Sequence, residues 1–367
     1  MKFLFLFSTS TLTGQAAQSY NILKYLAESG QKVITIIDQN REGNLRDYLL
    51  KADAKIIDTV SISNKNKIIS KYAEINRVHS IIMDMRPDFI VSSFSNDHFT
   101  AVLANKKSDF KGKIIRFFHS RKVRKDIIHK RLFENTDIFI FYDFDIYLDF
   151  KRKYPELEKR IYLLPPSIDT ELFIVKNRDE TRRYFGLKSD IFVVGYTGMF
   201  QRGRMHRELI KSFYEYKKLN RESKLLIVGS GETFDKIKKY SECVLRDDVI
   251  FTGFVSDERL VDAYNAMDLF LLLKGGHDSS LRMLYEAQSC GTYILTYKNY
   301  PALRLLEVTN YGGFLSDVND KKGIGNSIYD SQKVVNDSLR ISIHKKVREE
   351  FGIDKIGKLF LKICEDL

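Results

Sequence analysis

The sequence contains little cysteine and no long apolar run. Its three cysteines, Cys243, Cys290 and Cys364, are an odd number without metal-site spacing, which is typical of a chain kept reduced in the cytoplasm. No apolar run approaches the length of a membrane span, and no zinc-finger spacing or aromatic ribonucleoprotein motif indicates nucleic-acid binding. The apolar opening, residues 1–7, leads into polar residues 8–11 without a small-residue cleavage pattern. We therefore expect a first buried strand there, and not a signal peptide.

The composition predicts two globular domains. At 367 residues the chain can hold two full cores, and 44% hydrophobic with 29% charged residues is typical of a globular protein. The formal net charge is +12, and part of the excess lies between two predicted strands of the first half. Such an excess is typical either of a solvated helix face or of a surface for anionic lipid headgroups or a lipid-phosphate acceptor. This basic cluster comprises Arg116, Arg121, Lys122, Arg124, Lys125, Lys130 and Arg131.

The stretch 269–297 reads as a strand, a loop, a helix and a second strand. Residues 269–273 are an uninterrupted apolar run, which predicts a strand covered on both faces. Residues 281–289 predict a helix. Gly291 follows it, at the position where a helix often ends in a residue with left-handed backbone angles. The loop-to-helix corner of such a unit lies at the carboxyl end of a parallel sheet. Free N–H groups and the helix dipole attract phosphate there.

Two carboxylates, Asp278 and Glu286, lie eight residues apart in this unit. The helix is apolar on more than one side, so Glu286 should be buried and needs a hydrogen-bonding partner. A nearby Arg or Lys would be the structural solution, and a ligand the functional one. The run from Asp278 to Glu286 resembles the carboxylate-x7-Glu motif of retaining GT-B glycosyltransferases, specifically glycosyltransferase family 4. This resemblance implies that Glu286 binds the ribose of a nucleotide-sugar and Asp278 contacts the donor sugar, while N–H groups of Ser279, Ser280 and Leu281 hold the diphosphate.

Three further segments of the second half resemble motifs of the same family. Gly198 precedes Arg202 and Arg204, where the family places basic groups that neutralise the departing diphosphate. Met199 stands where the family usually has Arg. The segment with Gly229 resembles the family's Val-Gly-x-Gly turn. Residues 249–253, followed by Phe254, resemble its Val-x-Phe-x-Gly segment beside the nucleotide base.

The first half predicts further alternating strands and helices. A strand over 3–7, a loop ending at Gly14 and a helix over 15–29 resemble the family's first unit, whose loop approaches the donor phosphate or the acceptor. His119 follows the predicted strand 113–118, and the resemblance implies a histidine that touches the donor sugar. Asp143 and Asp145 imitate the metal motif of GT-A enzymes, but the GT-B resemblance implies no metal.

Together these patterns predict an α/β protein of two Rossmann-like, doubly wound domains facing across a cleft, the GT-B fold. The expected ranges are 1–168 for the acceptor-side domain, 169–350 for the nucleotide-sugar domain and 351–367 for a helix crossing back to the first. The implied function is retaining, metal-independent transfer of a hexosyl group from a UDP- or GDP-sugar, without a cofactor. The catalytic set is His119, Asp278 and Glu286.

The expected acceptor is a glycan or lipid-linked hydroxyl in surface-glycan synthesis, reached in the cytoplasm or at the inner membrane face, with anionic membrane as a peripheral partner. Two alternatives stay open. One is a non-catalytic GT-B-like protein that binds sugar nucleotides, and the other is a GT-B enzyme of another type, such as a phosphorylase or an epimerase. Fold alone does not decide among them.

Overall fold

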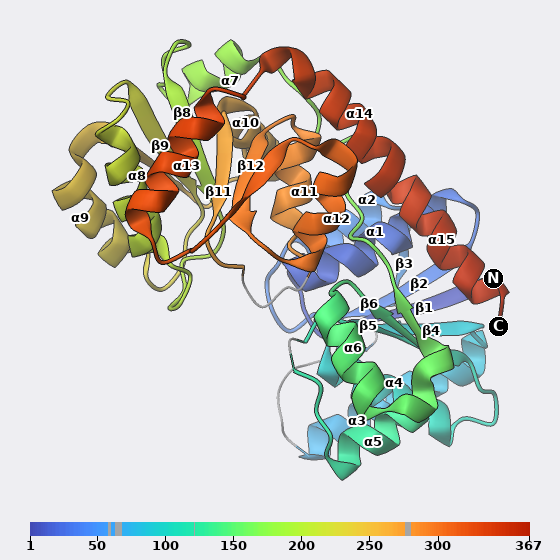
Figure 1. The fold of residues 1–367 in the computed structure, drawn as a ribbon. Helices are drawn as coiled ribbons and strands as arrows, with labels where there is room; N and C mark the ends of the chain where they lie inside the picture. The colour runs from blue at the N-terminus through green and yellow to red at the C-terminus, as the bar shows by residue number, and fades with distance from the viewer. Residues whose placement is uncertain (58–59, 63–67, 121, 276–279) are drawn as a thin grey trace. The chain divides into compact units, whose positions relative to one another are not determined.

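The computed structural model describes residues 1–57, 60–62, 68–120, 122–275 and 280–367 (Figure 1). The chain divides into two compact units. Unit 1 consists mainly of residues 1–167 and 353–367, and unit 2 mainly of residues 168–352. Each unit has its own parallel sheet and its own core, and each is described by itself.

Unit 1 is built on a seven-stranded sheet in the order β3-β2-β1-β4-β5-β6-β7, with every neighbouring pair parallel. The strand order reverses between β1 and β4, which are hydrogen-bonded neighbours. The sheet is therefore doubly wound. Its strands are β1 (Lys2–Phe7), β2 (Lys32–Ile37), β3 (Lys55–Ile56), β4 (Phe89–Ser92), β5 (Lys113–Phe118), β6 (Ile138–Phe141) and β7 (Ile161–Leu163).

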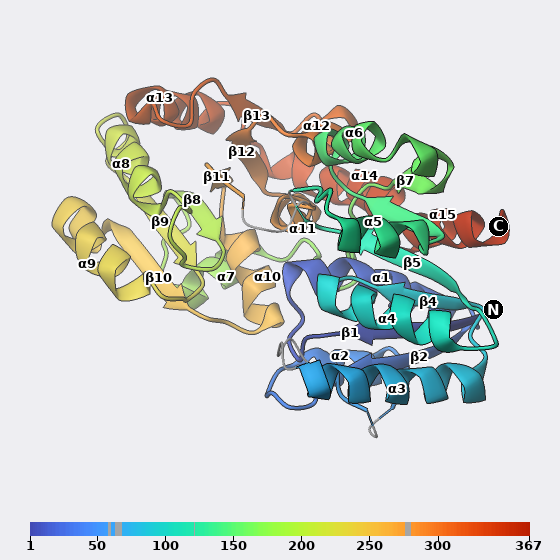
Figure 2. The ribbon, with the colours of Figure 1, turned by 90° about the horizontal axis from the view of Figure 1, so that it is seen from below.

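Side-chain alternation along β1 divides the core of unit 1 into two layers. Phe3, Phe5 and Phe7 pack with α1, α2 and α15 on one face, whereas Leu4 and Leu6 pack with α3, α4, α5 and α6 on the other. In Figure 2, α3 and α4 run side by side, in agreement with their contacts. The helices are α1 (Gly14–Glu28), α2 (Leu45–Lys51), α3 (Ile68–Met85), α4 (Ser95–Lys107), α5 (Ile127–Glu134), α6 (Phe144–Lys153), the 3-10 turn η1 (Pro155–Arg160) and α15 (Ile353–Glu365).

Unit 2 repeats the plan with a six-stranded parallel sheet in the order β10-β9-β8-β11-β12-β13. Here the order reverses between β8 and β11, and Leu269 of β11 lies opposite Val194 of β8. The strands are β8 (Phe192–Thr197), β9 (Ser223–Val228), β10 (Val249–Gly253), β11 (Leu269–Leu272), β12 (Tyr293–Tyr297) and β13 (Gly312–Leu315).

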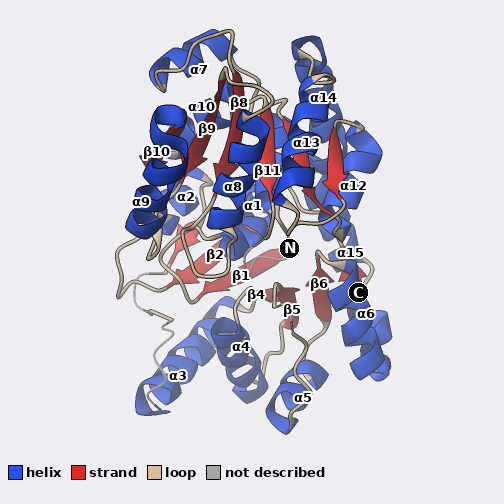
Figure 3. Ribbon diagram, turned by 60° about the vertical axis from the view of Figure 1, so that its left-hand side comes forward, coloured by secondary structure: helices blue, strands red, loops and turns tan. Residues whose placement is uncertain are grey.

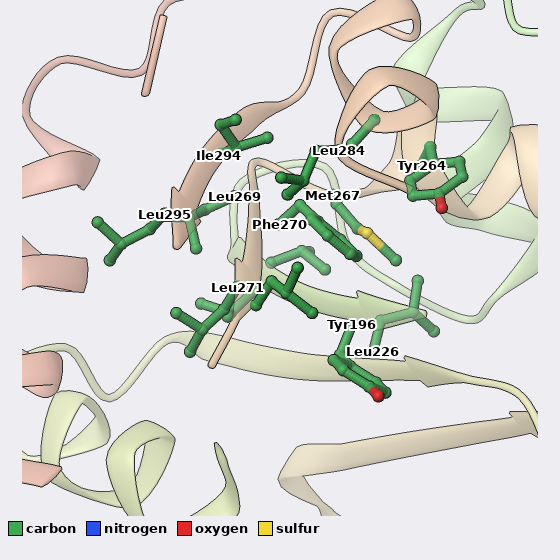
Figure 4. Close-up of a cluster of buried hydrophobic side chains, with 14 of the residues drawn as sticks. Tyr196, Leu226, Tyr264, Met267, Leu269, Phe270, Leu271, Leu284, Ile294 and Leu295 are labelled. Carbon is green, nitrogen blue, oxygen red and sulfur yellow. The ribbon is translucent and has the colours of Figure 1, made fainter. Parts of the chain in front are cut away.

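Helices cover both faces of the unit 2 sheet (Figure 3). Figure 4 shows side chains from β9, β11, α11 and β12 gathering in its core, among them Leu226, Phe270, Leu284 and Ile294. The helices are α7 (Arg178–Tyr184), α8 (His206–Lys217), α9 (Phe234–Leu245), α10 (Asp257–Ala266), α11 (Arg282–Ser289), α12 (Tyr300–Thr309), α13 (Lys321–Gln332) and α14 (Arg340–Phe351), with 3-10 turns η2 (Arg246–Asp248) and η3 (Asp337–Leu339).

The prediction of two doubly wound α/β sheets is confirmed. The closing helix differs from its predicted range, because residue 351 is the last of α14 and α15 begins only at Ile353. Gly352 interrupts the two helices and forms a parallel bridge with Ile168, whose N–H donates to the Phe351 carbonyl at 2.9 Å. Among the described residues, none of the helices is both long enough and apolar enough to span a bilayer.

Candidate functional site

The carboxyl ends of β8 and β11 flank the point where the strand order of unit 2 reverses. Ligands of open α/β sheets bind in the crevice outside such ends. The loop after β8 contains Gly198, Arg202 and Arg204, and the segment after β11 leads to Leu281 and Glu286. The topology therefore places these sequence-predicted residues on two segments that flank one switch point.

The loops after β8 and β9 interlock so closely that two glycines are required. A Cβ at Gly229 would lie 2.0 Å from the Gly198 carbonyl oxygen, and one at Gly231 would lie 2.5 Å from that of Phe200. Both glycines have positive φ, which other residues rarely adopt. The Phe200 N–H donates to the Ser230 carbonyl at 2.9 Å, and the Thr233 N–H donates to the Phe200 carbonyl at 3.2 Å. These contacts fix the backbone before Arg204.

Three side chains, from β8, the following loop and the first residue of α8, have buried polar atoms without a hydrogen-bond partner in the described part of the chain. They are Nε and Nη1 of Arg204, the hydroxyl of Tyr196 and Nε2 of His206. The His206 ring stacks on Phe200, with centroids 4.3 Å apart, and lies edge-on to Tyr196 at 5.2 Å. Burial, and then the charge of Arg204, lower the pKa of His206 to about 4. A buried guanidinium beside neutral polar groups suits an oxyanion.

The surroundings of the two candidate arginines distinguish them. Arg202 is exposed, and its backbone N–H donates to Glu232 Oε1 at 3.2 Å. Arg204 is half-buried, with two guanidinium nitrogens shielded from solvent. Burying a charge without a partner costs free energy, so a bound anion would gain more at Arg204 than at Arg202.

Glu286 is 3% exposed and lies at the end of a polar chain that crosses from β8 to α11. The Tyr264 hydroxyl donates to Glu286 Oε2 at 2.8 Å and lies 2.8 Å from Thr197 Oγ1. Burial and the Glu286 carboxylate raise the pKa of Tyr264 well above its ordinary value, so Tyr264 keeps its proton. Thr197 must then donate to the Tyr264 oxygen. The order of donors is thus Thr197, Tyr264, Glu286.

Arg282 completes the surroundings of Glu286. Its Nε lies 3.3 Å from Glu286 Oε1, one helical turn earlier on α11. The structural alternative for Glu286, pairing with a nearby cation, is therefore realised, and it coexists with the Tyr264 contact. The i,i+4 spacing of Arg282 and Glu286 was a sequence signal for this pair. No pattern in the local sequence predicted the hydrogen bonds of Tyr264 and Thr197.

The remaining predicted residues of unit 2 lie around the same ends. Leu281 immediately precedes α11 and has left-handed backbone angles, φ 47° and ψ 41°. Ser280 before it is buried. Phe254 follows β10 and is 80% exposed, as an aromatic side chain that stacks on a ligand would be. Met199 is also exposed. Asp278 and Ser279 lie outside the described residues.

In unit 1, Gly14 is the first residue of α1, and the Thr13 side chain caps the helix by accepting from the Ala16 N–H at 3.3 Å. His119 directly follows β5 and is 1% exposed. It stacks on Tyr142 with ring centroids 5.3 Å apart. The sequence had placed His119 at the sheet edge, and the structure adds an aromatic support for the imidazole.

The pair Asp143 and Asp145 lies at the start of α6. Asp143 is the N-cap, and its Oδ1 accepts from the Ile146 N–H at 3.1 Å. The described residues contain no group of three or more His, Cys, Asp or Glu side chains arranged to hold a metal ion. The capping contact gives Asp143 a structural function that does not require a metal.

Several solved structures have the same architecture. A glycosyltransferase from Rickettsia africae has a TM-score of 0.80 at 14% identity, covering 100% of this chain and 98% of that one. HepE of Anabaena, solved in complex with UDP, has a TM-score of 0.80 at 16% identity and covers 100% of both chains. It was also solved with UDP-glucose. The fold of this chain is thus GT-B.

The sequence of unit 2 is similar to that of a known family. Residues 177–348 match the family model described as Glycosyl transferases group 1. The capsular polysaccharide biosynthesis glycosyltransferase CapM of Staphylococcus aureus is 29% identical over 213 residues, which are 54% of this chain and 54% of CapM. The chain thus spans about half the length of this curated relative.

Proposed function

We propose that this protein is a retaining glycosyltransferase that moves a hexosyl group from a nucleoside-diphosphate-sugar to an acceptor hydroxyl. One observation carries the proposal. Buried polar atoms of Arg204, Tyr196 and His206 gather after β8, at the switch point of a group 1 domain. An oxyanion of the donor diphosphate would satisfy them and take up the charge of Arg204.

The donor would be held by parts of unit 2. Arg204 and the N–H groups that precede α11 would hold the diphosphate, including those of Ser279, Ser280 and Leu281. Glu286 would accept from the ribose hydroxyls, oriented by its bond from Tyr264. Phe254 is exposed beside the carboxyl end of β10 and would stack on the base. The UDP and UDP-glucose complexes of HepE favour UDP over GDP as the nucleotide.

In the reaction, the bond between the anomeric carbon and the diphosphate oxygen breaks, and its electron pair leaves with the nucleoside diphosphate. The acceptor oxygen forms the new bond on the same face of the sugar. Its proton passes to the departing diphosphate, which becomes the base that accepts it. The chain's own contribution is electrostatic, because Arg204 and backbone N–H groups are oriented before charge develops. His119 and Asp278 would contact the sugar.

Calorimetry and turnover test this proposal together. Glu286→Gln should weaken binding of UDP-glucose and of UDP by roughly tenfold or more, since losing a charged hydrogen-bond partner costs about 1.5–3 kcal/mol. Glu307→Gln, an exposed glutamate paired with Arg304, is the matched control. A folded Glu286→Gln variant that binds UDP like the wild type would refute the assignment. Stabilisation by UDP-sugar without turnover would instead favour the binding-protein alternative.

The stereochemistry and the metal requirement need separate measurements. Proton NMR of the first product should show the anomeric configuration of the donor, and an inverted anomer would contradict retention. Activity should survive exhaustive chelation, because Arg204 and backbone N–H groups supply the charge stabilisation. Loss on chelation that manganese restores would overturn the metal-independent mechanism.

The acceptor is proposed to be a surface glycan or its lipid-linked precursor, as the name of CapM suggests. Peripheral contact with an anionic membrane is supported by the start of α5, where Ile127 and Ile128 are 73% and 62% exposed and Lys125 and Lys130 lie two residues away on either side. Each such basic group near an anionic surface contributes about 1 kcal/mol. Co-sedimentation with anionic vesicles should be lost at high salt, and binding equal to that of neutral vesicles would contradict this contact.

A further inference from the structure

An arginine occupies an interior position of β5, among the side chains of a buried face. Arg116 lies between Ile114 and Phe118, which belong to the core layer on that face of the sheet, and it is only 4% exposed. Its Nη1 donates to the Phe94 carbonyl, whereas its Nε is buried without a hydrogen-bond partner in the described part of the chain. Burying a guanidinium here costs free energy, and that cost demands a compensating contact.

The nearest carboxylate only partly compensates Arg116. Asp97 Oδ1 lies 3.6 Å from Nη1, and the same carboxylate already accepts backbone N–H bonds from Ser93, Phe94 and His98 at 3.3, 2.7 and 2.9 Å. Burial raises the pKa of Asp97 to about 7, although Arg116 acts in the opposite direction. The Asp97 carboxylate thus serves three N–H donors and lies beyond hydrogen-bond distance of Arg116 Nη1, and it leaves the Arg116 Nε without a partner in the described part of the chain.

A cavity of about 70 Å³ opens over Arg116, at the carboxyl ends of β4 and β5. A site needs about 10–15 Å³ for one water, so this cavity has room for a group of several heavy atoms. The wall of the cavity contains Arg116, other basic side chains, imidazoles and a hydroxyl. Among the described residues, no carboxylate lines it. The polar wall includes Arg116, His98, His129, Lys122, Arg124 and Ser120.

The loop that carries two of these cations is held in place by its carbonyl groups. The Tyr154 hydroxyl donates to the Arg124 carbonyl at 2.6 Å, and Lys153 Nζ donates to the Val123 carbonyl at 3.0 Å. The wall is thus anchored to α6. His129 of the wall is paired with Asp126 at 2.8 Å, so the positive charge of the wall comes from Arg116, Lys122 and Arg124.

We propose that this cavity binds a phosphate group carried by the acceptor. The inference rests on the proposed glycosyltransferase function, because only that function makes the bound molecule an acceptor. A tetrahedral oxyanion would give the Arg116 Nε a partner and accept further bonds from Lys122 and Arg124. The phosphate could belong to a soluble sugar phosphate or to a lipid headgroup, and the chemistry at the cavity is the same for both.

The test measures binding of glucose 6-phosphate and of inorganic phosphate to the full chain by calorimetry, with UDP present at saturation so that the Arg204 site is filled. The double variant Lys122→Ala/Arg124→Ala removes two exposed wall cations and should fold normally. It should bind either phosphate at least tenfold more weakly. The control Lys125→Ala/Lys130→Ala removes the same charge from exposed positions outside the wall, and it should change binding less than twofold. Equal weakening in both variants, or in neither, would overturn the proposal.

Two further arms identify the source of the phosphate and separate this proposal from the proposed function. If vesicles of phosphatidic acid displace inorganic phosphate from the wild type, the site accepts a lipid phosphate; if only glucose 6-phosphate does, it accepts a soluble one. UDP binding without any phosphate binding would refute the cavity and leave the donor site standing. Phosphate binding that depends on Lys122 and Arg124, in a protein that ignores UDP, would support the cavity and refute the donor site.

Discussion

Arg202 and Arg204 lie two residues apart in one loop. Their side chains have the same chemistry, but the structure places them in different surroundings. Arg202 is exposed, and Arg204 has two guanidinium nitrogens buried without a hydrogen-bond partner in the described chain. The value of a charge to an anion depends on what else already contacts it and on how well water screens it. The two arginines therefore make a matched pair for mutation.

We expect Arg204→Gln to weaken UDP binding by about tenfold or more, since a charge-assisted hydrogen bond is worth about 1.5–3 kcal/mol. Arg202→Gln should change it less than twofold, because its exposed charge is screened by water and salt. Isothermal titration with UDP at two ionic strengths measures both variants. A larger loss in Arg202→Gln than in Arg204→Gln would reverse our assignment.

Asp97 gives a second prediction at this scale, which concerns pH. Burial raises its pKa in the folded protein to about 7 from an ordinary value of 3.8. The folded state then binds this proton more tightly than the unfolded state. The resulting stabilisation is fully present below pH 3.8 and is lost as pH rises through about 7, at up to about 1.4 kcal/mol per pH unit between the two values.

His206 acts in the opposite sense, because its pKa is lowered to about 4, and its contribution is lost as pH falls from 6.5 through 4. Only a difference measurement therefore isolates Asp97. The free energy of unfolding of the wild type minus that of Asp97→Asn should fall as pH rises from 4 to 7, as followed by urea denaturation. A difference that is flat, or that rises with pH, would contradict the raised pKa.

At the scale of elements, α15 packs very closely on α1. A Cβ at Gly357 would lie 2.1 Å from Tyr25 Cγ on α1, so the two helices meet where the glycine has no side chain. Phe360 of α15 then packs with Phe3 of β1 and Phe117 of β5, with ring centroids 6.4 and 5.7 Å away. Helix α15 is thus part of the core of unit 1.

This contact predicts that Gly357→Ala lowers the stability of the protein, whereas helix propensity alone predicts that it raises it. Alanine favours a helix over glycine by about 1 kcal/mol. Overpacking a filled contact typically costs about 1–3 kcal/mol, so Gly357→Ala should destabilise the protein on balance. Chemical denaturation measures it beside Lys358→Ala, an exposed neighbour on the same helix that should stay within about 0.5 kcal/mol of the wild type. Stabilisation by Gly357→Ala would mean that α15 does not pack as described.

The elements themselves were largely predictable from the sequence. Buried parallel strands read as apolar runs, such as residues 269–273, and a glycine after the helix, such as Gly291, marks its end. The break at Gly352 was missed, because the segment reads as one periodic helix and only the bridge to Ile168 shows why the chain turns there.

The burial of Glu286 was predictable, because the helix that carries it is apolar on more than one side, whereas its contacts with residues distant in sequence were not. Tyr264 lies 22 residues from Glu286, and Thr197 lies 67 residues from Tyr264. Their hydrogen bonds exist because β8, α10 and α11 meet in the fold. Arg116 was predicted to belong to a basic cluster between two strands, and this was wrong, because it lies inside β5 and is buried. Its cavity depends on α4, α5 and the loop after β5.

At the scale of the whole molecule, each unit has its own sheet and core, so we expect two thermal transitions. UDP at 100 times its Kd should stabilise unit 2 by about 2.7 kcal/mol and leave the transition of unit 1 in place. Differential scanning calorimetry with and without UDP checks this expectation.

Two variants assign the transitions. Gly357→Ala should lower only the transition of unit 1. Asp268→Asn should lower only that of unit 2, because Asp268 is buried and pairs with Arg178 and Arg182 at 2.7 and 2.5 Å. A single transition that every variant and ligand shifts alike would show that the units unfold as one.

The place of α15 in the chain sets the order in which a ribosome can finish the protein. The sheet of unit 1 is synthesised first, but the helix that packs against α1 and Phe3 is synthesised only after all of unit 2. Until α15 is made, the faces of Phe3 and Phe117 that pack against it stay uncovered. This lasts through about 185 residues of further translation, which take some ten to forty seconds at 5–20 residues per second. The unit that emerges first is completed last, and until α15 is made its apolar surface stays open to aggregation.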